Sequence, residues 1–309
     1  METKARESSS ALGRADASPA GAHAAAGPQS AAAGAAHAPP VTVILSEESG
    51  VQLGLSDLWR YRELLYFLTW RDIKVRYKQT ALGAAWAVIQ PLAQMLLFTL
   101  VFHRFAGLGS GDMPYPLFAY AGLLVWTFFA NAVLNSTHSL VTNTNLITKV
   151  YFPRVFIPAA AVAAGLVDLG IASVILAGLV AYYRIAPGWG AALLPLFIAL
   201  AVLLSLAVGM LISATTVKYR DLRHALPFVM QFWMFATPVI YPSTVVPDGW
   251  RQVLALNPAT GILEGFRASL TGGAIDRTLT VTAAVETVLL LALSFYVFRR
   301  NEETFADVI

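Results

Sequence analysis

Six long apolar stretches, separated by polar loops, constrain this chain more than any other feature of its sequence. They cover residues 82–102, 117–141, 155–183, 191–216, 226–240 and 279–298. Most of them reach the ~20 residues with which an α-helix crosses a ~30 Å hydrocarbon layer. The sequence therefore predicts an all-α integral membrane protein with six transmembrane helices.

The lysines and arginines fall mostly into alternate loops, which predicts an orientation. With the N-terminus inside, sixteen of the 21 basic residues lie on the inner side. The outer side holds the other five, which are Arg104, Arg184, Arg251, Arg267 and Arg277. Because positively charged loops stay in the cytoplasm, we expect both termini to be cytoplasmic.

The composition argues against several classes of function. The chain has no cysteine and its five histidines are scattered, so we expect no disulfide, no cysteine nucleophile and no metal site. The formal charge is only +3, and the basic residues lie beside membrane ends, where anionic lipids attract them; nucleic acid is not an expected partner. The phosphate-binding motif Gly-x-x-x-x-Gly-Lys-Ser/Thr and the common hydrolase motifs are missing, so we expect no catalytic residue and no cofactor in this chain.

Residues 1–50 differ from the rest of the chain. Positions 1–40 are rich in Ala, Gly, Ser and Pro and lack aromatic side chains. Such a segment buries too little apolar surface to offset its ordering entropy, so we expect a disordered cytoplasmic tail. A helical Ala-rich tail is the alternative, although its Gly and Pro residues would interrupt it. Residues 51–309 then form the transmembrane domain.

Residues 55–78 show a helical pattern of another kind. Aromatic residues, among them Trp59, Tyr66 and Trp70, recur at three- and four-residue steps, and basic residues occupy a different flank. An aromatic face beside a basic face is typical of a helix that lies in the cytoplasmic headgroup layer. A soluble helix that precedes the membrane is the alternative.

Two short inner loops, residues 143–158 and 218–227, combine charges with aromatic residues. We expect Tyr151, Phe152 and Tyr219 to be exposed, and exposed aromatic residues beside arginines favour a contact with another protein. The alternative is that both are ordinary positively charged inner loops.

The last outer loop, residues 241–278, is the longest. Two semi-apolar segments, 250–256 and 261–270, are separated in it by Asn257-Pro258. One interpretation is a pair of half-helices that re-enter the membrane, which requires surrounding protein or water. The other is a folded cap on the outer surface, and the sequence leaves both open.

The predicted spans contain two carboxylates, Asp168 and Glu286. A proton relay needs a chain of ionisable groups, so we expect these two acids to bond to neighbouring helices or to lie near water. The spans also contain many aromatic residues, which offer flat faces for sugar rings, although packing in a core or at the membrane boundary is their commoner use.

Many short blocks of the sequence resemble one known family, the permeases of polysaccharide-exporting ABC transporters of the type-2 membrane fold. The resemblance covers residues 55–309 almost completely, and the Ala-rich tail departs from it. The blocks that carry it are Arg71-Asp72-Ile73-Lys74-Val75-Arg76-Tyr77, Leu82-Gly83, Trp86, Gln90-Pro91, Pro114-Tyr115-Pro116, Phe118-Ala119-Tyr120-Ala121-Gly122-Leu123, Trp126-Thr127-Phe128-Phe129, Asn145-Leu146-Ile147, Lys149-Val150-Tyr151-Phe152-Pro153-Arg154, Lys218-Tyr219-Arg220-Asp221, Thr237-Pro238-Val239-Ile240-Tyr241-Pro242, Asn257-Pro258 and Glu264-Gly265-Phe266-Arg267.

The resemblance implies a homodimeric permease in a bacterial inner membrane, paired with two copies of a separate subunit that binds ATP and Mg. The residues expected to couple to that ATPase are Asn145, Leu146, Lys149, Tyr151, Phe152, Pro153, Arg154, Lys218, Tyr219, Arg220 and Asp221. Those expected on a gate helix at the cytoplasmic mouth, where a lipid diphosphate would enter, are Trp59, Arg71, Lys74, Arg76 and Lys78. Those expected to line a channel are Trp126, Phe129, Phe232 and Trp233. Those expected in a re-entrant outer hairpin are Asn257, Pro258, Glu264 and Arg267.

The implied function is export of a glycan on a polyprenyl diphosphate lipid, such as an O-antigen, from the cytoplasmic to the outer face. Export of capsule or teichoic acid by the same fold is an alternative. A membrane-embedded glycan-processing enzyme is another, but it would need clustered acids. The outer loops offer only Asp112, Asp248, Glu264 and Asp276, which are widely spaced.

Overall fold

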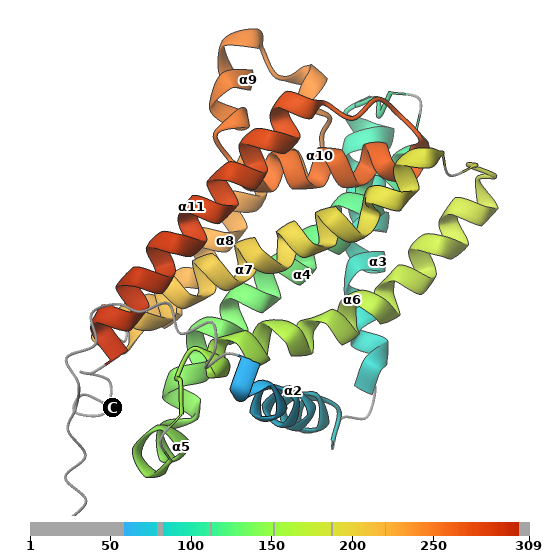
Figure 1. Cartoon of the computed structure of the whole chain (residues 1–309). Coiled ribbons are helices and arrows are strands. Elements are labelled where there is room, and N and C mark those ends of the chain that lie inside the picture. Colours follow the sequence, from blue (N-terminus) through green and yellow to red (C-terminus); the bar gives the residue numbers. More distant parts are fainter. Residues whose placement is uncertain are drawn as a thin grey trace, which may run out of the picture. The chain divides into compact units, whose positions relative to one another are not determined.

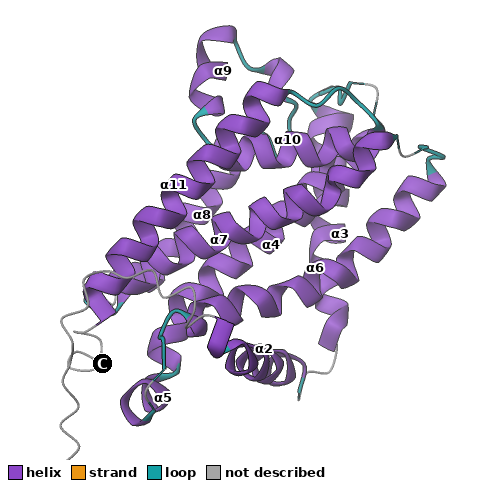
Figure 2. Ribbon diagram, in the orientation of Figure 1, coloured by secondary structure: helices purple, strands orange, loops and turns teal. Residues whose placement is uncertain are grey.

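The computed structural model describes residues 59–78, 83–111, 113–150, 152–186, 188–219 and 221–302. The chain divides after Ser49 into two units, and every described residue belongs to the second one. The described residues form helices and connecting loops without a β-strand (Figure 2), as the sequence predicts. The predicted tail, residues 1–50, lies outside the described residues.

Five helical segments in the described part of the chain are long and apolar enough to cross a membrane. They are α3 (Trp86–Phe98) with its π-helical extension η2 (Thr99–Phe105), α4 (Tyr115–Thr142), α6 (Phe156–Tyr182), η3 (Trp189–Leu193) with α7 (Leu194–Thr216), and α11 (Arg277–Glu302). These segments correspond to five of the six predicted spans.

The remaining predicted span, residues 226–240, differs from the expectation. It forms α8 (Leu222–Ala236), a helix of 15 residues that is about 22 Å long and therefore shorter than the hydrocarbon layer. The helix ends because Thr237 precedes Pro238, and a residue before proline is disfavoured in the helical conformation. Thr237 is accordingly extended, with φ −112° and ψ 141°.

Helix α4 is the centre of the bundle. It contacts α3, α6, α7, α8 and α10, and 78% of its most apolar window is buried, against 11% for the first span. Small residues allow close helix contacts, as membrane helices commonly require. At Gly209 of α7, for example, an added Cβ would collide with the side chain of Ser136 on α4. The first span, in contrast, leaves most of its apolar surface free for lipid or another chain.

A second apolar cluster gathers one end of the bundle. It contains Leu68 of α2 (Arg62–Tyr77) and Ile147 of α5 (Thr144–Lys149), together with Phe298 near the end of α11. The last turns of α4 and α7 and the first turn of α6 complete it. Figure 1 shows α2 and α5 near this end, while α9 and α10 lie at the opposite end. We call it the α5-end cluster.

The opposite end is built from α8, the short η4 (Ser243–Val245), α9 (Asp248–Ala255) and α10 (Pro258–Thr271). The two predicted half-helices are thus present as α9 and α10, and they differ in burial. Helix α9 exposes Trp250, Val253 and the following Leu256, whereas α10 is almost entirely buried against α4, α7 and α11. Helix α10 is therefore packed against the bundle, at the end opposite α5 (Figure 1). Re-entry into the membrane and a cap on the outer surface both stay predictions.

Candidate functional site

The predicted coupling loop is divided between surface and core. Asn145 and Lys149 are exposed on α5, Leu146 is half-buried, and Ile147 between them anchors the helix in the α5-end cluster. The second inner loop exposes Lys218, Tyr219 and Asp221 next to Val217, which is buried in the same cluster. Tyr151 and Arg220 lie outside the described residues. Both loops therefore present polar side chains from a shared apolar base.

Phe152 corrects an expectation about this loop. The sequence predicts an exposed aromatic residue there, but Phe152 is only 5% exposed and belongs to the α5-end cluster with Val155 and Phe298. The ring fills the space beneath the loop, and half-buried Pro153 follows it directly. Loop sequence alone does not reveal such packing, because it depends on a helix that is distant along the chain.

Arg154 also faces its own chain. Its backbone N–H donates a hydrogen bond of 3.0 Å to Oε1 of Glu302, and its guanidinium donates to the main-chain carbonyl of Glu302. The other carboxylate oxygen of Glu302 accepts from Arg299 at 3.2 Å. Sequence reasoning missed Glu302, because nothing in the local pattern at the end of α11 indicates a partner in the α5–α6 loop.

The residues of the predicted gate helix have different environments. Trp59, Tyr66 and Trp70 are exposed, as suits insertion into a headgroup layer. Arg71 pairs with the adjacent Asp72 at 2.8 Å, and Lys74 lies 5.4 Å from the ring centroid of Trp70. Lys74 and Lys78 are exposed, so α2 presents accessible positive charge beside its aromatic face.

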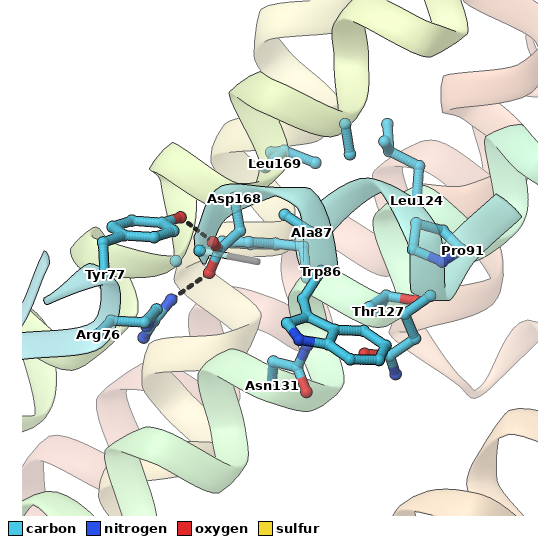
Figure 3. Close-up of a pocket in the computed structure, with 15 residues that line it drawn as sticks. Arg76, Tyr77, Trp86, Ala87, Pro91, Leu124, Thr127, Asn131, Asp168 and Leu169 are labelled. Carbon is cyan, nitrogen blue, oxygen red and sulfur yellow. Dashed lines mark hydrogen bonds and ion pairs between the residues drawn. The ribbon is translucent and has the colours of Figure 1, made fainter. Parts of the chain in front are cut away.

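Arg76 is the exception on this helix, because it points into the bundle. Arg76 and Tyr77, in the last turn of α2, both donate to the carboxylate of Asp168 in α6 (Figure 3). Burial, followed by the hydrogen bond to Asp168, raises the pKa of Tyr77 to about 12, so its hydroxyl stays protonated and keeps donating. The expectation that Asp168 bonds to a neighbouring helix is confirmed. For Glu286, Oε2 has no hydrogen-bond partner among the described residues.

A cavity of about 230 Å³ lies beside this pair, between the end of α2 and helices α3, α4 and α6. Trp86, Thr127 and Asn131 line it together with Arg76 and Asp168 (Figure 3). The side chains of the ion pair are each 27% exposed. A carboxylate near the middle of a 27-residue span is therefore stabilised by two donors and by partial exposure beside the cavity.

The four predicted channel aromatics do not form one wall. Trp126 and Phe129 are buried, and Trp233 packs edge-on against both, with ring centroids 6.3 and 5.2 Å away. Phe232 is 61% exposed and stacks edge-on with exposed Phe228 at 4.7 Å. Within one chain, then, only Phe232 of the four presents an open aromatic face.

Asn257, in the predicted outer hairpin, joins the start of α10 to the end of α8. It caps α10 by accepting from the N–H of Ala259 at 3.2 Å, and it accepts from the indole of Trp233, also at 3.2 Å. Its amide donates to Thr237 at 2.9 Å. Pro258 is buried at the first position of α10, where its missing N–H costs nothing. The cap therefore fixes the start of α10 against the end of α8.

Arg267 is buried, with 5% exposure, and fixes the other side of the same break. Its guanidinium donates to the carbonyls of Phe118, Pro238 and Val239, at 3.2 Å and 2.6 Å for the first two. It also lies 3.7 Å from the ring centroid of Phe118. Glu264 is half-buried. The carbonyls of Pro238 and Val239, in the turn after α8, are thus satisfied by a side chain of α10, as buried backbone groups require.

The comparisons with known proteins agree with this arrangement. Residues 63–271 match the family described as ABC-2 type transporter. This chain belongs to that family. The match begins in α2 and ends with the last residue of α10, so it includes the predicted coupling loops, Asp168 and the network around Arg267 but stops before α11.

Individual relatives match between 75% and 82% of this chain. The chain is 31% identical to the O-antigen export system permease protein RfbA of Myxococcus xanthus, covering 82% of this chain and 98% of the relative. It is 26% identical to the protein of the same name in Klebsiella pneumoniae, over 80% of this chain and 95% of the relative. It is 23% identical to the polysialic acid transport protein KpsM of Escherichia coli, over 75% of this chain and 91% of the relative.

Proposed function

We propose that this chain is the membrane permease of an ABC exporter that moves a polysaccharide, linked to a polyprenyl diphosphate lipid, from the cytoplasmic to the outer face of a bacterial inner membrane. A separate subunit hydrolyses the ATP. The observation that carries the proposal is the 31% identity over 98% of a relative named as an O-antigen export permease. Family membership and five membrane-length helices support it.

The partner ATPase would dock at the α5 end. Exposed Asn145 and Lys149 on α5 and exposed Tyr219 offer it polar and aromatic contacts. Helix α5 is anchored in the same apolar cluster as α2 and the start of α6. A displacement of α5 by the ATPase would therefore move both α2, the proposed gate helix, and the membrane span α6. Two ATPase copies would serve two copies of this chain.

The second copy of the chain would cover the open apolar faces of α3 and α8. Trp86, Phe228 and Phe232 are 56%, 67% and 61% exposed, respectively. A seam between two such faces would provide an aromatic wall along which sugar rings can slide, since flat rings offer contact area with little directional bonding. In this arrangement Trp126 and Phe129 support Trp233 from behind and do not face the glycan.

The orientation follows from the charges. With the α5 end inside, both termini are cytoplasmic, and exposed Arg71, Lys74 and Lys78 on and after α2 would attract the lipid diphosphate. Helix α8 and the turn after it would make the remaining one of six crossings. Helix α10 would be the re-entrant part of the outer hairpin, since non-spanning backbone at membrane depth needs the protein surroundings that it has.

Capsule export is the second candidate, and one observation favours it. The likeness to a polysialic acid transport protein reaches 91% of that relative's length. The lower identity, 23% against 31%, places the O-antigen function first.

The test is co-expression with the ATPase encoded beside this gene, reconstitution, and measurement of ATP hydrolysis with and without glycan linked to polyprenyl diphosphate. The proposal predicts stable co-purification and glycan-stimulated turnover, both weakened by joint substitution of Lys149 and Tyr219 with Ala. A chain that neither binds the ATPase nor changes its turnover would contradict the proposal.

A further inference from the structure

The end of the last helix and the coupling loop hold each other by two opposite hydrogen bonds. The carboxylate of Glu302, the last described residue of α11, accepts from the backbone N–H of Arg154 at 3.0 Å. In return, the guanidinium of Arg154 donates to the backbone carbonyl of Glu302. Each residue therefore uses its side chain to satisfy the backbone of the other.

The two bonds lie beside the start of α6 and the last described turn of α11. The first N–H groups and the last carbonyls of an α-helix have no partner within the helix. Arg154 immediately precedes Val155, the N-cap of α6, and Val155 provides no side-chain cap. The carboxylate of Glu302 thus supplies an acceptor and a negative charge beside the positive end of α6, and Arg154 supplies a cation beside the last described turn of α11.

Apolar packing keeps the two ends in register. Phe298, one turn before Glu302, is fully buried and shares the α5-end cluster with Phe152 and Val155 on either side of Arg154. Arg299 bonds the second carboxylate oxygen of Glu302 at 3.2 Å, which holds that side chain toward the loop. The contact thus joins the start of α6 to the end of α11.

We propose that Glu302 is a positioning residue for ATP-driven transport: it fixes the α5–α6 loop to α11, so that a displacement of α5 moves the bundle and not the loop alone. This inference rests on the proposed function. It assigns Arg154 to the same internal clamp and leaves contact with the ATPase to exposed residues such as Lys149.

The clamp can be tested without any transport assay. The chain contains no cysteine, so a single Lys149→Cys substitution carries a spin label on α5 in the full-length protein. Glu302→Ala should increase the mobility of this label, and Glu302→Gln, which keeps one acceptor oxygen, should have an intermediate effect. Arg300→Ala, a change at a neighbouring exposed charge, should leave it unchanged. A label at Tyr182→Cys, the far end of α6, should report no change in any variant.

The transport role is tested with unlabelled protein in complex with the ATPase. Glu302→Ala should co-purify normally and bind the ATPase with unchanged affinity, while glycan-stimulated turnover falls about tenfold or more, as loss of a hydrogen bond to a charged group would cause. Glu302→Gln should recover part of the stimulation. Lys149→Ala should do the reverse, weakening assembly while leaving stimulation intact once the ATPase is saturating.

The outcomes separate the two claims. Unchanged label mobility in Glu302→Ala, or increased mobility with full glycan stimulation, would overturn the positioning role. If the wild-type complex shows no glycan-stimulated turnover at all, the proposed transport function fails, whereas the label still decides whether the clamp exists. If Glu302→Ala does not fold, the Glu302→Gln variant carries both measurements.

Discussion

Two arginines, one at each end of the bundle, hold loops by the same chemistry but in different surroundings. Arg267 is buried and donates to three backbone carbonyls around the break after α8. Arg154 is half-buried, and among the described residues its guanidinium donates to one carbonyl, that of Glu302. Buried, fully bonded segments open rarely, whereas accessible contacts with few partners open at low free-energy cost. We infer that the Arg267 end is a fixed scaffold and that the α5 end carries the movement.

Removing Arg267 should produce the largest effect. Arg267→Met keeps the length of the side chain but leaves three carbonyls without their donor, so we expect a loss of about 3–5 kcal/mol in the free energy of unfolding. Arg251→Met is the matched control, because Arg251 also bonds carbonyls near this end but is exposed. Thermal unfolding in detergent compares them. Equal losses of unfolding free energy in the two variants would show that the buried Arg267 stabilises the protein no more than the exposed Arg251.

Crowding the same site should have the next largest effect. At Gly122 an added Cβ would collide with the guanidinium of Arg267 and lie 2.6 Å from the carbonyl oxygen of Val239. Gly122→Ala should therefore cost about 1–3 kcal/mol of stability. Gly170→Ala in α6, where nothing lies within 4 Å of the added atom, should be neutral or slightly stabilising. A Gly122→Ala protein as stable as the wild type would show that the structure around Arg267 can shift, which contradicts a fixed scaffold at this end.

A smaller effect is expected at the Arg76–Asp168 pair, which joins α2 to α6. Both side chains are partly exposed, so a double-mutant cycle of Arg76→Gln and Asp168→Asn should give a coupling energy of about 1 kcal/mol. The same variants should alter glycan-stimulated turnover more than stability, because the pair positions the gate helix. A coupling energy near zero would show that the Arg76–Asp168 pair does not hold α2 against α6.

The exposed face of α5 should matter least for stability. Lys149→Ala should change the free energy of unfolding by less than about 0.5 kcal/mol, as is usual for surface positions. Its affinity for the ATPase should nevertheless fall several-fold, as measured by titrating labelled ATPase. Arg277→Ala, an exposed cation at the opposite end, serves as the control and should bind the ATPase normally.

The features that the sequence predicts correctly are those that depend on local pattern. Hydrophobic length located five spans, and Asn257-Pro258 correctly marked the break between the two segments that form α9 and α10. The free-energy cost of a carboxylate in a bilayer indicated that Asp168 needs a partner. In the structure, Arg76 and Tyr77 both donate hydrogen bonds to it.

The features that the sequence did not predict depend on residues far apart in the chain. Phe152 was expected on the surface, but it is buried in a cluster that also contains residues of α2, α4, α7 and α11. The role of Arg154 depends on Glu302, 148 positions later. The length of α8 was overestimated because apolar residues continue past Thr237, although Pro238 ends the helix there. Periodicity does not detect either long-range pairing or a helix end inside an apolar run.

The most direct test of the central claim is transport itself. Proteoliposomes containing this chain and its ATPase would receive a fluorescent glycan on polyprenyl diphosphate at the face exposed to ATP, and an impermeant quencher would report arrival at the other face. The account predicts protection of the glycan that depends on ATP and on both subunits. Complete quenching with ATP and the full complex present would contradict it.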